Sequence, residues 1–342
     1  MYSDVYIRLE FRRPELKSLG PMLDQHFRKF DQIDKKPGFF TCVIWLLRGL
    51  VNKSSRDYSA LKRYIFANRR PVESTLAVED LPEIEVIFVS KLEDIQILGL
   101  AVKSIVKNSV NPISRIVIAV PETQCKPTSD YFINLANEKL VEVVSENELV
   151  TEAIVQLIRE KSPERFGWIL QQVLVASFVL TTKSENVLIV DSDTLLIRPQ
   201  VWVDKFKTQI LMPTFELHLP YYNFFQHFSS KYPAPKISFV SHHMLVQTSI
   251  FREVYQVFNG DVYTALEQAF SFADLSDNSP FDLKYEIYAQ YLINNYKNQV
   301  SLIKWANLSC TRQQLATLIE GKSTAEGYAR LYNSLSLHHW NH

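Results

Sequence analysis

From residue 83 onward, the spacing of hydrophobic residues alternates between the period of a strand and the period of a helix. The segment EIEVIFVS at 83–90 is a short β-branched run, which is typical of a buried strand. Residues 91–109 carry apolar positions at helical spacing, and RIVIAV at 115–120 predicts a second strand. Two strands joined by a helix predict a βαβ unit with parallel strands and a right-handed crossover.

The alternation continues toward the end of the chain and predicts an α/β fold with a single, mostly parallel central sheet and flanking helices. We expect further strands at 141–145, 186–197 and 236–249, and further helices at 167–182, 251–258 and 285–296. We assign this domain to residues 81–342. Ligands of such sheets bind at the carboxyl ends of the strands, so the candidate chemistry is expected where strands end.

Residues 1–80 do not follow this alternation and are predicted to form a helical, basic N-terminal extension. Helix candidates are FFTCVIWLLRGLVNK at 39–53 and DYSALKRYIFANRR at 57–70. Residues 1–70 contain 15 Lys and Arg against 7 Asp and Glu, a net charge of +8, whereas the whole chain is neutral. The helices can dock on the catalytic body or lie on a membrane surface, and we keep both interpretations open.

Composition narrows the class of protein. The chain has 342 residues, of which 46% are hydrophobic, enough for a substantial core. Its zero net charge gives no general attraction to nucleic acid, and we expect no such partner. The three cysteines are far apart and form no CxxC pair, which fits a reducing compartment. The longest apolar run, Phe39–Val51, is shorter than the ~20 residues that span a bilayer. We predict a cytoplasmic protein, with peripheral membrane association left open.

Two acids follow the central strand and are the main chemical signal. Asp191 and Asp193 come directly after the apolar run Val187–Val190. In an extended chain, residues two apart point to the same side. Two neighbouring carboxylates repel each other, and a divalent cation such as Mg²⁺ or Mn²⁺ relieves that repulsion while leaving positions for phosphate oxygens. The alternative is that both are ordinary turn acids, which are common after strands.

Asp191-Ser192-Asp193 resembles the DxD motif of GT-A glycosyltransferases. Residues 83–342 also resemble an uncharacterised glycosyltransferase-like family (domain of unknown function 6492). The segments that carry this resemblance are EIEVIFVSKLEDIQILGLAVKSI, GWILQQVLVASF, VLIVDSDTLLIRP, FVSHHMLV, YEIYAQYL and SLHHW. The chain departs from the pattern at Lys284, where an acid is expected, and at Ala289, where a glycine-like position is expected. The resemblance implies the GT-A fold, a nucleotide-diphosphate sugar donor, Mn²⁺ or Mg²⁺, and a glycan, lipid or protein acceptor.

The resemblance also implies roles for residues outside the DxD strand. A histidine near the chain end often completes the metal shell in GT-A enzymes, which makes His338 the candidate and His339 the second choice. His243 is expected to touch the diphosphate or the acceptor, unless it is a core histidine. Gln171 or its neighbour Gln172 is expected to reach the donor sugar, the alternative being a buried glutamine bonded to backbone.

Glu286 is the candidate acceptor base, because an inverting transfer needs a carboxylate to take the acceptor's proton. On a helix it would share a face with Asp282, four residues earlier. A solvated helix acid is the alternative, and a retaining enzyme would need no such base. Ser90 and Asp94 follow the first strand and are placed to meet the nucleoside, or to cap the next helix.

Three functions remain in view. The first is a metal-dependent glycosyltransferase, acting in glycan or polysaccharide synthesis. The second is a sugar nucleotidyltransferase on the same fold, which usually carries a Gly-rich loop after its first strand. The chain has eight glycines and no GxGxxG or GK[ST] motif, which ranks this second function low. The third is a nucleotide-binding, non-catalytic member of the same fold.

Overall fold

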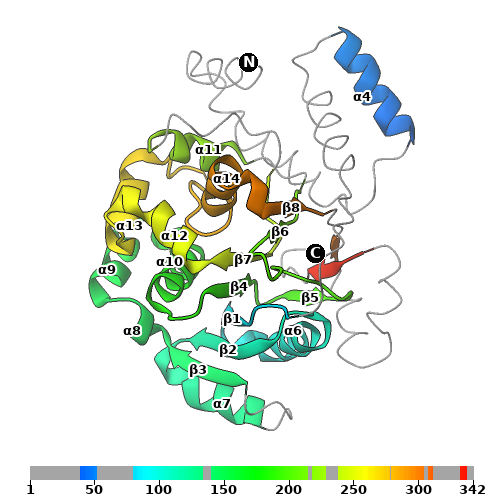
Figure 1. Ribbon diagram of the computed structural model, residues 1–342. Helices are drawn as coiled ribbons and strands as arrows, with labels where there is room; N and C mark the ends of the chain where they lie inside the picture. The colour runs from blue at the N-terminus through cyan, green and yellow to red at the C-terminus, as the bar shows by residue number, and fades with distance from the viewer. Residues whose placement is uncertain are drawn as a thin grey trace.

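The computed structural model describes residues 39–51, 80–133, 140–214, 218–228, 238–277, 279–303, 307–310 and 332–336. The α/β class expected from the sequence is confirmed, with a central, mostly parallel sheet and flanking helices (Figure 1). The division into residues 1–80 and 81–342 stays a prediction.

The main sheet has five strands in the order β3-β2-β1-β4-β7. They are β1 (Ile84–Val89), β2 (Ile113–Val120), β3 (Val141–Ser145), β4 (Asn186–Val190) and β7 (His243–Gln247). The first four strands are parallel, and β7 runs antiparallel to β4. Strand β1 has β2 on one side and β4 on the other, so the direction in which strands are added to the sheet reverses at β1.

Helices cover both faces of the sheet, because alternate side chains of each buried strand enter two different cores. Ile84, Val86 and Phe88 of β1 pack in the core that contains α6 (Ile95–Asn108). Ile87 and Val89 pack in the core of α10 (Phe166–Thr181). All six residues of β1 are buried, as expected for a strand with an apolar layer on each side.

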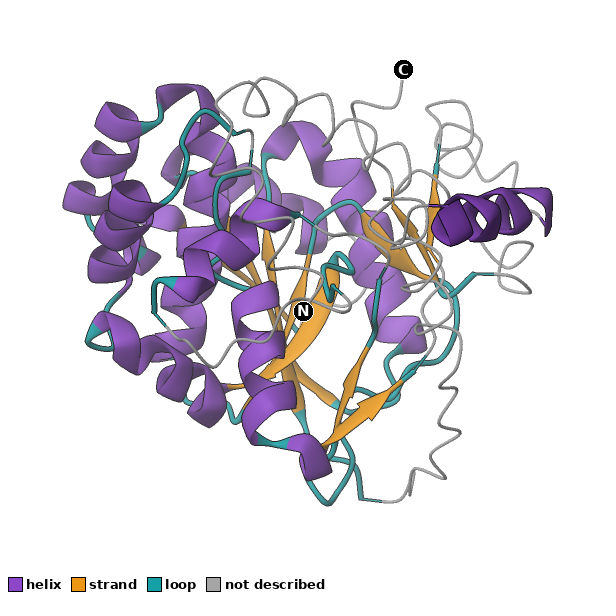
Figure 2. Cartoon of the chain, turned by 90° about the horizontal axis from the view of Figure 1, so that it is seen from above, coloured by secondary structure: helices purple, strands orange, loops and turns teal. Residues whose placement is uncertain are grey.

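The other helices complete these two layers. They are α7 (Cys125–Ile133), α8 (Glu146–Leu149), α9 (Glu152–Lys161), α11 (Leu219–Gln226), α12 (Thr248–Tyr255), α13 (Val262–Phe272) and α14 (Glu286–Asn295). Short 3₁₀ turns are η1 (Leu92–Asp94), η2 (Glu122–Gln124), η3 (Pro163–Arg165), η4 (Gln256–Phe258) and η5 (Lys297–Gln299). Helix α10 contacts α12 and α13, and α14 contacts α11 and α12, on the face opposite α6 (Figure 1). Seen from above, helices lie on both sides of the central strands (Figure 2).

Two small sheets lie beside the main one. One contains β5 (Thr194–Leu196), β10 (Ser334–Ser336) and β9 (Asn307–Ser309), and the other contains β6 (Gln209–Leu211) and β8 (Val300–Leu302). Strand β10 pairs antiparallel with β5, with Ser336 opposite Thr194. The end of the chain therefore returns to the segment that follows the predicted DxD motif.

In the N-terminal region, the structure describes helix α4 (Phe39–Val51), which confirms a helix within the predicted range 39–53. Several of its large apolar side chains are exposed, among them Phe40 (81%) and Val51 (91%). The second predicted helix, at 57–70, lies outside the described residues. Among the residues described, no helix has both the length and the apolar character needed to cross a membrane.

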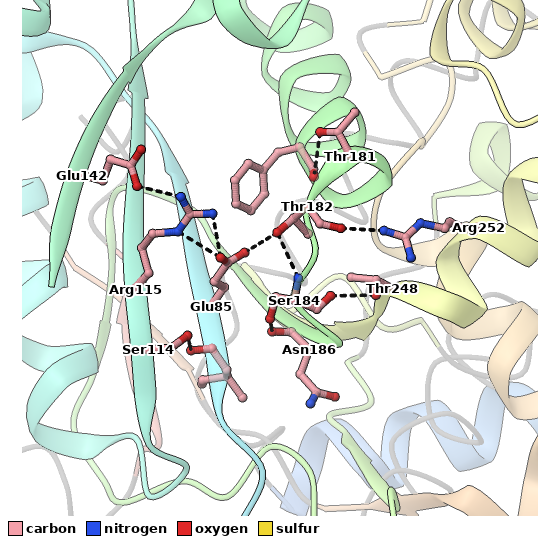
Figure 3. Close-up of polar contacts among 12 residues, drawn as sticks. Glu85, Ser114, Arg115, Glu142, Thr181, Thr182, Ser184, Asn186, Thr248 and Arg252 are labelled. Atoms are coloured by element: carbon pink, nitrogen blue, oxygen red, sulfur yellow. Dashed lines mark hydrogen bonds and ion pairs between the residues drawn. The ribbon is translucent and has the colours of Figure 1, made fainter.

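A polar network joins three strands at the amino-terminal end of the sheet (Figure 3). The guanidinium of Arg115 donates to Glu85 Oε1 through Nε (2.9 Å) and Nη2 (2.7 Å), and to Glu142 Oε2 through Nη1 (2.7 Å). The other oxygen of Glu85 accepts from the hydroxyl of Thr182 at 2.7 Å. The guanidinium of Arg252 donates to the carbonyl oxygen of Thr182, just past the end of α10. The buried Glu85 carboxylate is thereby paired on both oxygens.

Replacing Glu85 by leucine should lower the free energy of unfolding by about 2 kcal/mol, because it leaves the Thr182 hydroxyl without its acceptor and removes a two-bond ion pair. Urea denaturation measures this change. The matched control is Glu142→Leu. It removes an exposed ion pair with Arg115, and its loss should lower the free energy of unfolding by less than about 1 kcal/mol. Equal losses in the two variants would contradict the role given to the Glu85 contacts.

Candidate functional site

The candidate site lies at the carboxyl ends of β1 and β4. Ile87 of β1 stands opposite Ile189 of β4, so the residues that follow the two strands, Ser90 and Asp191, emerge at the same edge of the sheet. Strand order reverses at β1, and crevices at such points are where open α/β sheets bind ligands. The predicted DxD motif is therefore at the place where this fold class binds ligands.

Asp191 is held by three side chains from two other segments. Its Oδ1 accepts from Lys284 Nζ at 2.8 Å and from the Tyr285 hydroxyl at 2.9 Å. Its Oδ2 lies 3.3 Å from His242 Nδ1. Burial alone would raise the pKa of this carboxyl, but the Lys284 ammonium and His242 hold it well below its ordinary value. Asp191 is therefore a fixed carboxylate, with 21% of its side chain exposed.

The backbone turns between the two acids. The amide of Thr194 donates to the carbonyl of Asp191 at 3.0 Å, and residues 192–193 form a turn before β5 begins. The extended conformation expected for this segment is therefore wrong, and the argument that placed both carboxylates on one side no longer holds. Asp193 is partly buried, and its charge contributes to a raised pKa of the Tyr285 hydroxyl, whose largest cause is burial.

His242, not His243, lies beside the acids. His242 precedes β7, has a positive φ of 63°, and accepts at its carbonyl the amide hydrogen of Asp191 at 2.8 Å. His243 is 1% exposed and packs edge-to-face on Trp202, with ring centroids 5.3 Å apart. Burial lowers the pKa of His243 to about 3. The structure thus gives His242 the place that the sequence analysis assigned to His243.

The segment that presents Lys284 is fixed by its neighbours. The amide of Leu283 donates to Gln172 Oε1 at 2.9 Å, and its carbonyl accepts from the Tyr255 hydroxyl at 2.8 Å. Gln172 is the buried member of the glutamine pair, whereas Gln171 is partly exposed on α10. Gln172 is therefore a buried glutamine bonded to backbone, which was the alternative to a contact with the donor sugar.

Asp282 lies before α14 and not on it. Its carboxylate accepts backbone hydrogen bonds from three residues at the start of that helix, Tyr285, Glu286 and Ile287. Burial raises its pKa. The prediction that Asp282 and Glu286 share a helix face is therefore wrong. Helix α14 begins at Glu286, and the Asp282 carboxylate accepts hydrogen bonds from backbone amides at its first turn.

Glu286 is fully buried and bonded on both carboxylate oxygens. Oε1 accepts from the Tyr222 hydroxyl at 2.7 Å and from Gln290 Nε2 at 2.6 Å. Oε2 accepts from Ser238 Oγ at 2.8 Å and from the Phe239 amide at 2.9 Å. Burial raises its pKa. These contacts tie α11 and the segment before β7 to α14, which is a structural role. The base role stays a prediction.

Two residues at the end of β1 face the same edge as the acids. Ser90 is 6% exposed, and among the described residues nothing hydrogen-bonds to its buried Oγ. Asp94 ends η1 and makes no side-chain capping bond to α6, so the helix-cap alternative for Asp94 does not hold. A buried hydroxyl without a protein partner is a place where a ligand can bond.

The predicted metal ligands divide into three cases. Asp193 is a carboxylate of the kind that Mn²⁺ and Mg²⁺ prefer. Asp191 does not fit, because an ion on Oδ1 would lie beside the Lys284 ammonium, and two cations at that distance repel. His338 lies outside the described residues. Within the described ranges, no cluster of three or more His, Cys, Asp or Glu residues is placed to hold a metal ion.

Sequence reasoning missed Lys284, Tyr285 and His242 as neighbours of the acids. Lys284 was visible as a departure from the family pattern, but its contact with Asp191 joins residues 93 positions apart, which no local spacing reveals.

No model of a known protein family matches the chain, and no curated protein matches it. Among solved structures, the apo crystal structure of mouse xyloside xylosyltransferase 1 aligns with a TM-score of 0.42 and 10% sequence identity. The alignment covers 76% of this chain and 99% of that chain.

Glu286→Ala should lower the free energy of unfolding by about 3 kcal/mol, because it strands several buried donors at once. Glu286→Gln should also destabilise, since its amide group would face donors such as the Phe239 amide. Thermal or urea unfolding measures both. Glu160→Ala is the control, because that residue lies on the exposed side of α9. Unchanged stability in both Glu286 variants would contradict the structural role.

Proposed function

We propose that the chain transfers a sugar from a nucleotide-diphosphate sugar to an acceptor, at the carboxyl ends of β1 and β4. The observation that carries the proposal is the acidic turn Asp191–Asp193, placed at the point of strand-order reversal and fixed there by Lys284, Tyr285 and His242. A fixed acidic turn at this edge suits a ligand that combines hydroxyl groups with a metal-bound diphosphate.

The end of β1 offers contacts for the nucleoside part of such a donor. The buried Ser90 hydroxyl has an open hydrogen-bonding capacity, and Asp94 lies at the following strand-to-helix junction. A carboxylate accepts hydrogen bonds from ribose hydroxyls, and a serine hydroxyl can donate or accept. Ser90 follows β1 and the acidic turn follows β4, its neighbour in the sheet, so one extended donor can reach both places.

The divalent ion of the proposal is Mn²⁺ or Mg²⁺, held by Asp193 and His338. Strand β10 supports this choice, because Ser336 pairs with Thr194, the residue after Asp193, and His338 follows two positions later in the sequence. When bound, such an ion stabilises the negative charge that builds on the departing diphosphate. The acceptor is a glycan, a lipid or a protein, and the base that serves it is left unassigned.

Thermal unfolding with Mn²⁺ and each of UDP, GDP, CDP and dTDP tests the donor site. One of these nucleotides at about 100 times its dissociation constant should stabilise the protein by about 2.7 kcal/mol. The shift should require the metal and should be lost in Asp193→Asn. Asp130→Asn, the same change on the exposed face of α7, should keep it.

Product analysis separates sugar transfer from its alternatives. Release of a nucleoside diphosphate from the matching nucleotide sugar supports the proposal. Release of pyrophosphate from a nucleoside triphosphate and a sugar phosphate would indicate a nucleotidyltransferase, and binding without any product would indicate a non-catalytic member of the fold. No shift with any nucleotide would refute the proposed donor site.

A further inference from the structure

Lys284 places a positive charge beside Asp191, one of the two acids predicted to bind a metal ion. We infer that Asp191 is held by this resident cation and is not a metal ligand, so that the two acids of the turn have separate tasks. The inference rests on the proposed function in that it assigns metal binding at this site to Asp193 without Asp191.

The contact between the two residues is close and largely enclosed. Lys284 is 6% exposed, and its ammonium lies 2.8 Å from Asp191 Oδ1 and 4.3 Å from the centre of the Tyr285 ring. A buried ammonium is costly without a counter-charge, and removing one partner of a buried ion pair is strongly destabilising. A divalent ion that took over Asp191 would leave this ammonium unpaired beside a second cation.

The lysine cannot easily withdraw, because the backbone on both sides of it is bonded. Leu283 is held through its amide by Gln172 and through its carbonyl by Tyr255. The Tyr285 amide donates to Asp282, and its hydroxyl donates to Asp191. Helices α10 and α12 thereby fix the segment that aims Lys284 at the acid. This arrangement differs from that of a flexible surface lysine, which would have no such support.

The charge balance of the turn follows from this pairing. Lys284 neutralises Asp191, so this carboxylate offers no uncompensated charge to a second cation. If the lysine charge is removed, the turn carries the full charge of Asp191 two residues from Asp193, and it should bind a divalent ion more tightly. The gain should depend on Asp191, because a neutral residue there provides no second charge.

Mn²⁺ binding by the full-length protein, measured by calorimetry without nucleotide, tests the inference. Asp191→Asn should weaken Mn²⁺ binding only through the uncompensated Lys284 charge, and therefore less than Asp193→Asn, which should weaken it by at least about tenfold. Lys284→Gln should tighten binding by at least about tenfold, and the double variant Lys284→Gln/Asp191→Asn should lose that gain. Lys103→Gln, an exposed lysine on α6, is the control and should change nothing.

Folding is monitored for each variant, because Asp191→Asn leaves a buried ammonium without its carboxylate. The double variant removes both charges and keeps the comparison valid even if that single variant unfolds. Equal losses of Mn²⁺ affinity in Asp191→Asn and Asp193→Asn would overturn the inference, as would unchanged affinity, or no binding at all, in Lys284→Gln.

The experiment is independent of the donor. If Lys284→Gln tightens Mn²⁺ binding through Asp191, but no nucleotide stabilises the protein, the proposed function fails and the assignment of Asp191 stands. If nucleotides bind with Mn²⁺ and both aspartates prove equally necessary for the metal, the proposed function stands and the assignment fails.

Discussion

The burial of one ammonium group constrains the arrangement of the site more than any other interaction described here. Lys284 is almost fully enclosed, and it needs a carboxylate within bonding distance to remain charged there. Asp191 meets that need, which joins the end of β4 to the start of α14 across the edge of the sheet. The positions of Tyr285 and His242 follow, because both also bond to the same carboxylate.

The need of buried polar groups for partners also explains why polar side chains lie at the two ends of the main sheet. Both faces of β1 are covered by apolar cores, so polar side chains can be satisfied only where the strands begin or end. At the beginning, Glu85 and Arg115 form a closed network whose partners are all protein groups. At the other end, Ser90 keeps a buried hydroxyl without a described partner. The amino-terminal end therefore serves stability, and the carboxyl end has capacity left for a ligand.

The sequence predicted those features that depend on local spacing. The strands at 84–89 and 113–120, with the helix between them, follow from hydrophobic period alone. The turn at Asp191–Asp193 did not, because an apolar run does not mark where extension stops. For His243 the sequence left a ligand contact and a core position open, because the alternation of side chains along a strand does not say which face meets the site. Glu286 appeared to be a helix acid, and the sequence could not show that α11 and Ser238 would enclose it.

The separation of the two neighbouring acids has a consequence for how the site is assembled. Asp191 is held by His242, Lys284 and Tyr285, which belong to the main body of the fold. Asp193 precedes β5, whose partner β10 comes from the end of the chain. One half of the acidic turn is thus fixed by the core, while the other adjoins a three-residue strand pairing that a ligand could reinforce. The two acids therefore depend on different parts of the fold, and a change at the β5–β10 pairing should act on Asp193 without displacing Asp191.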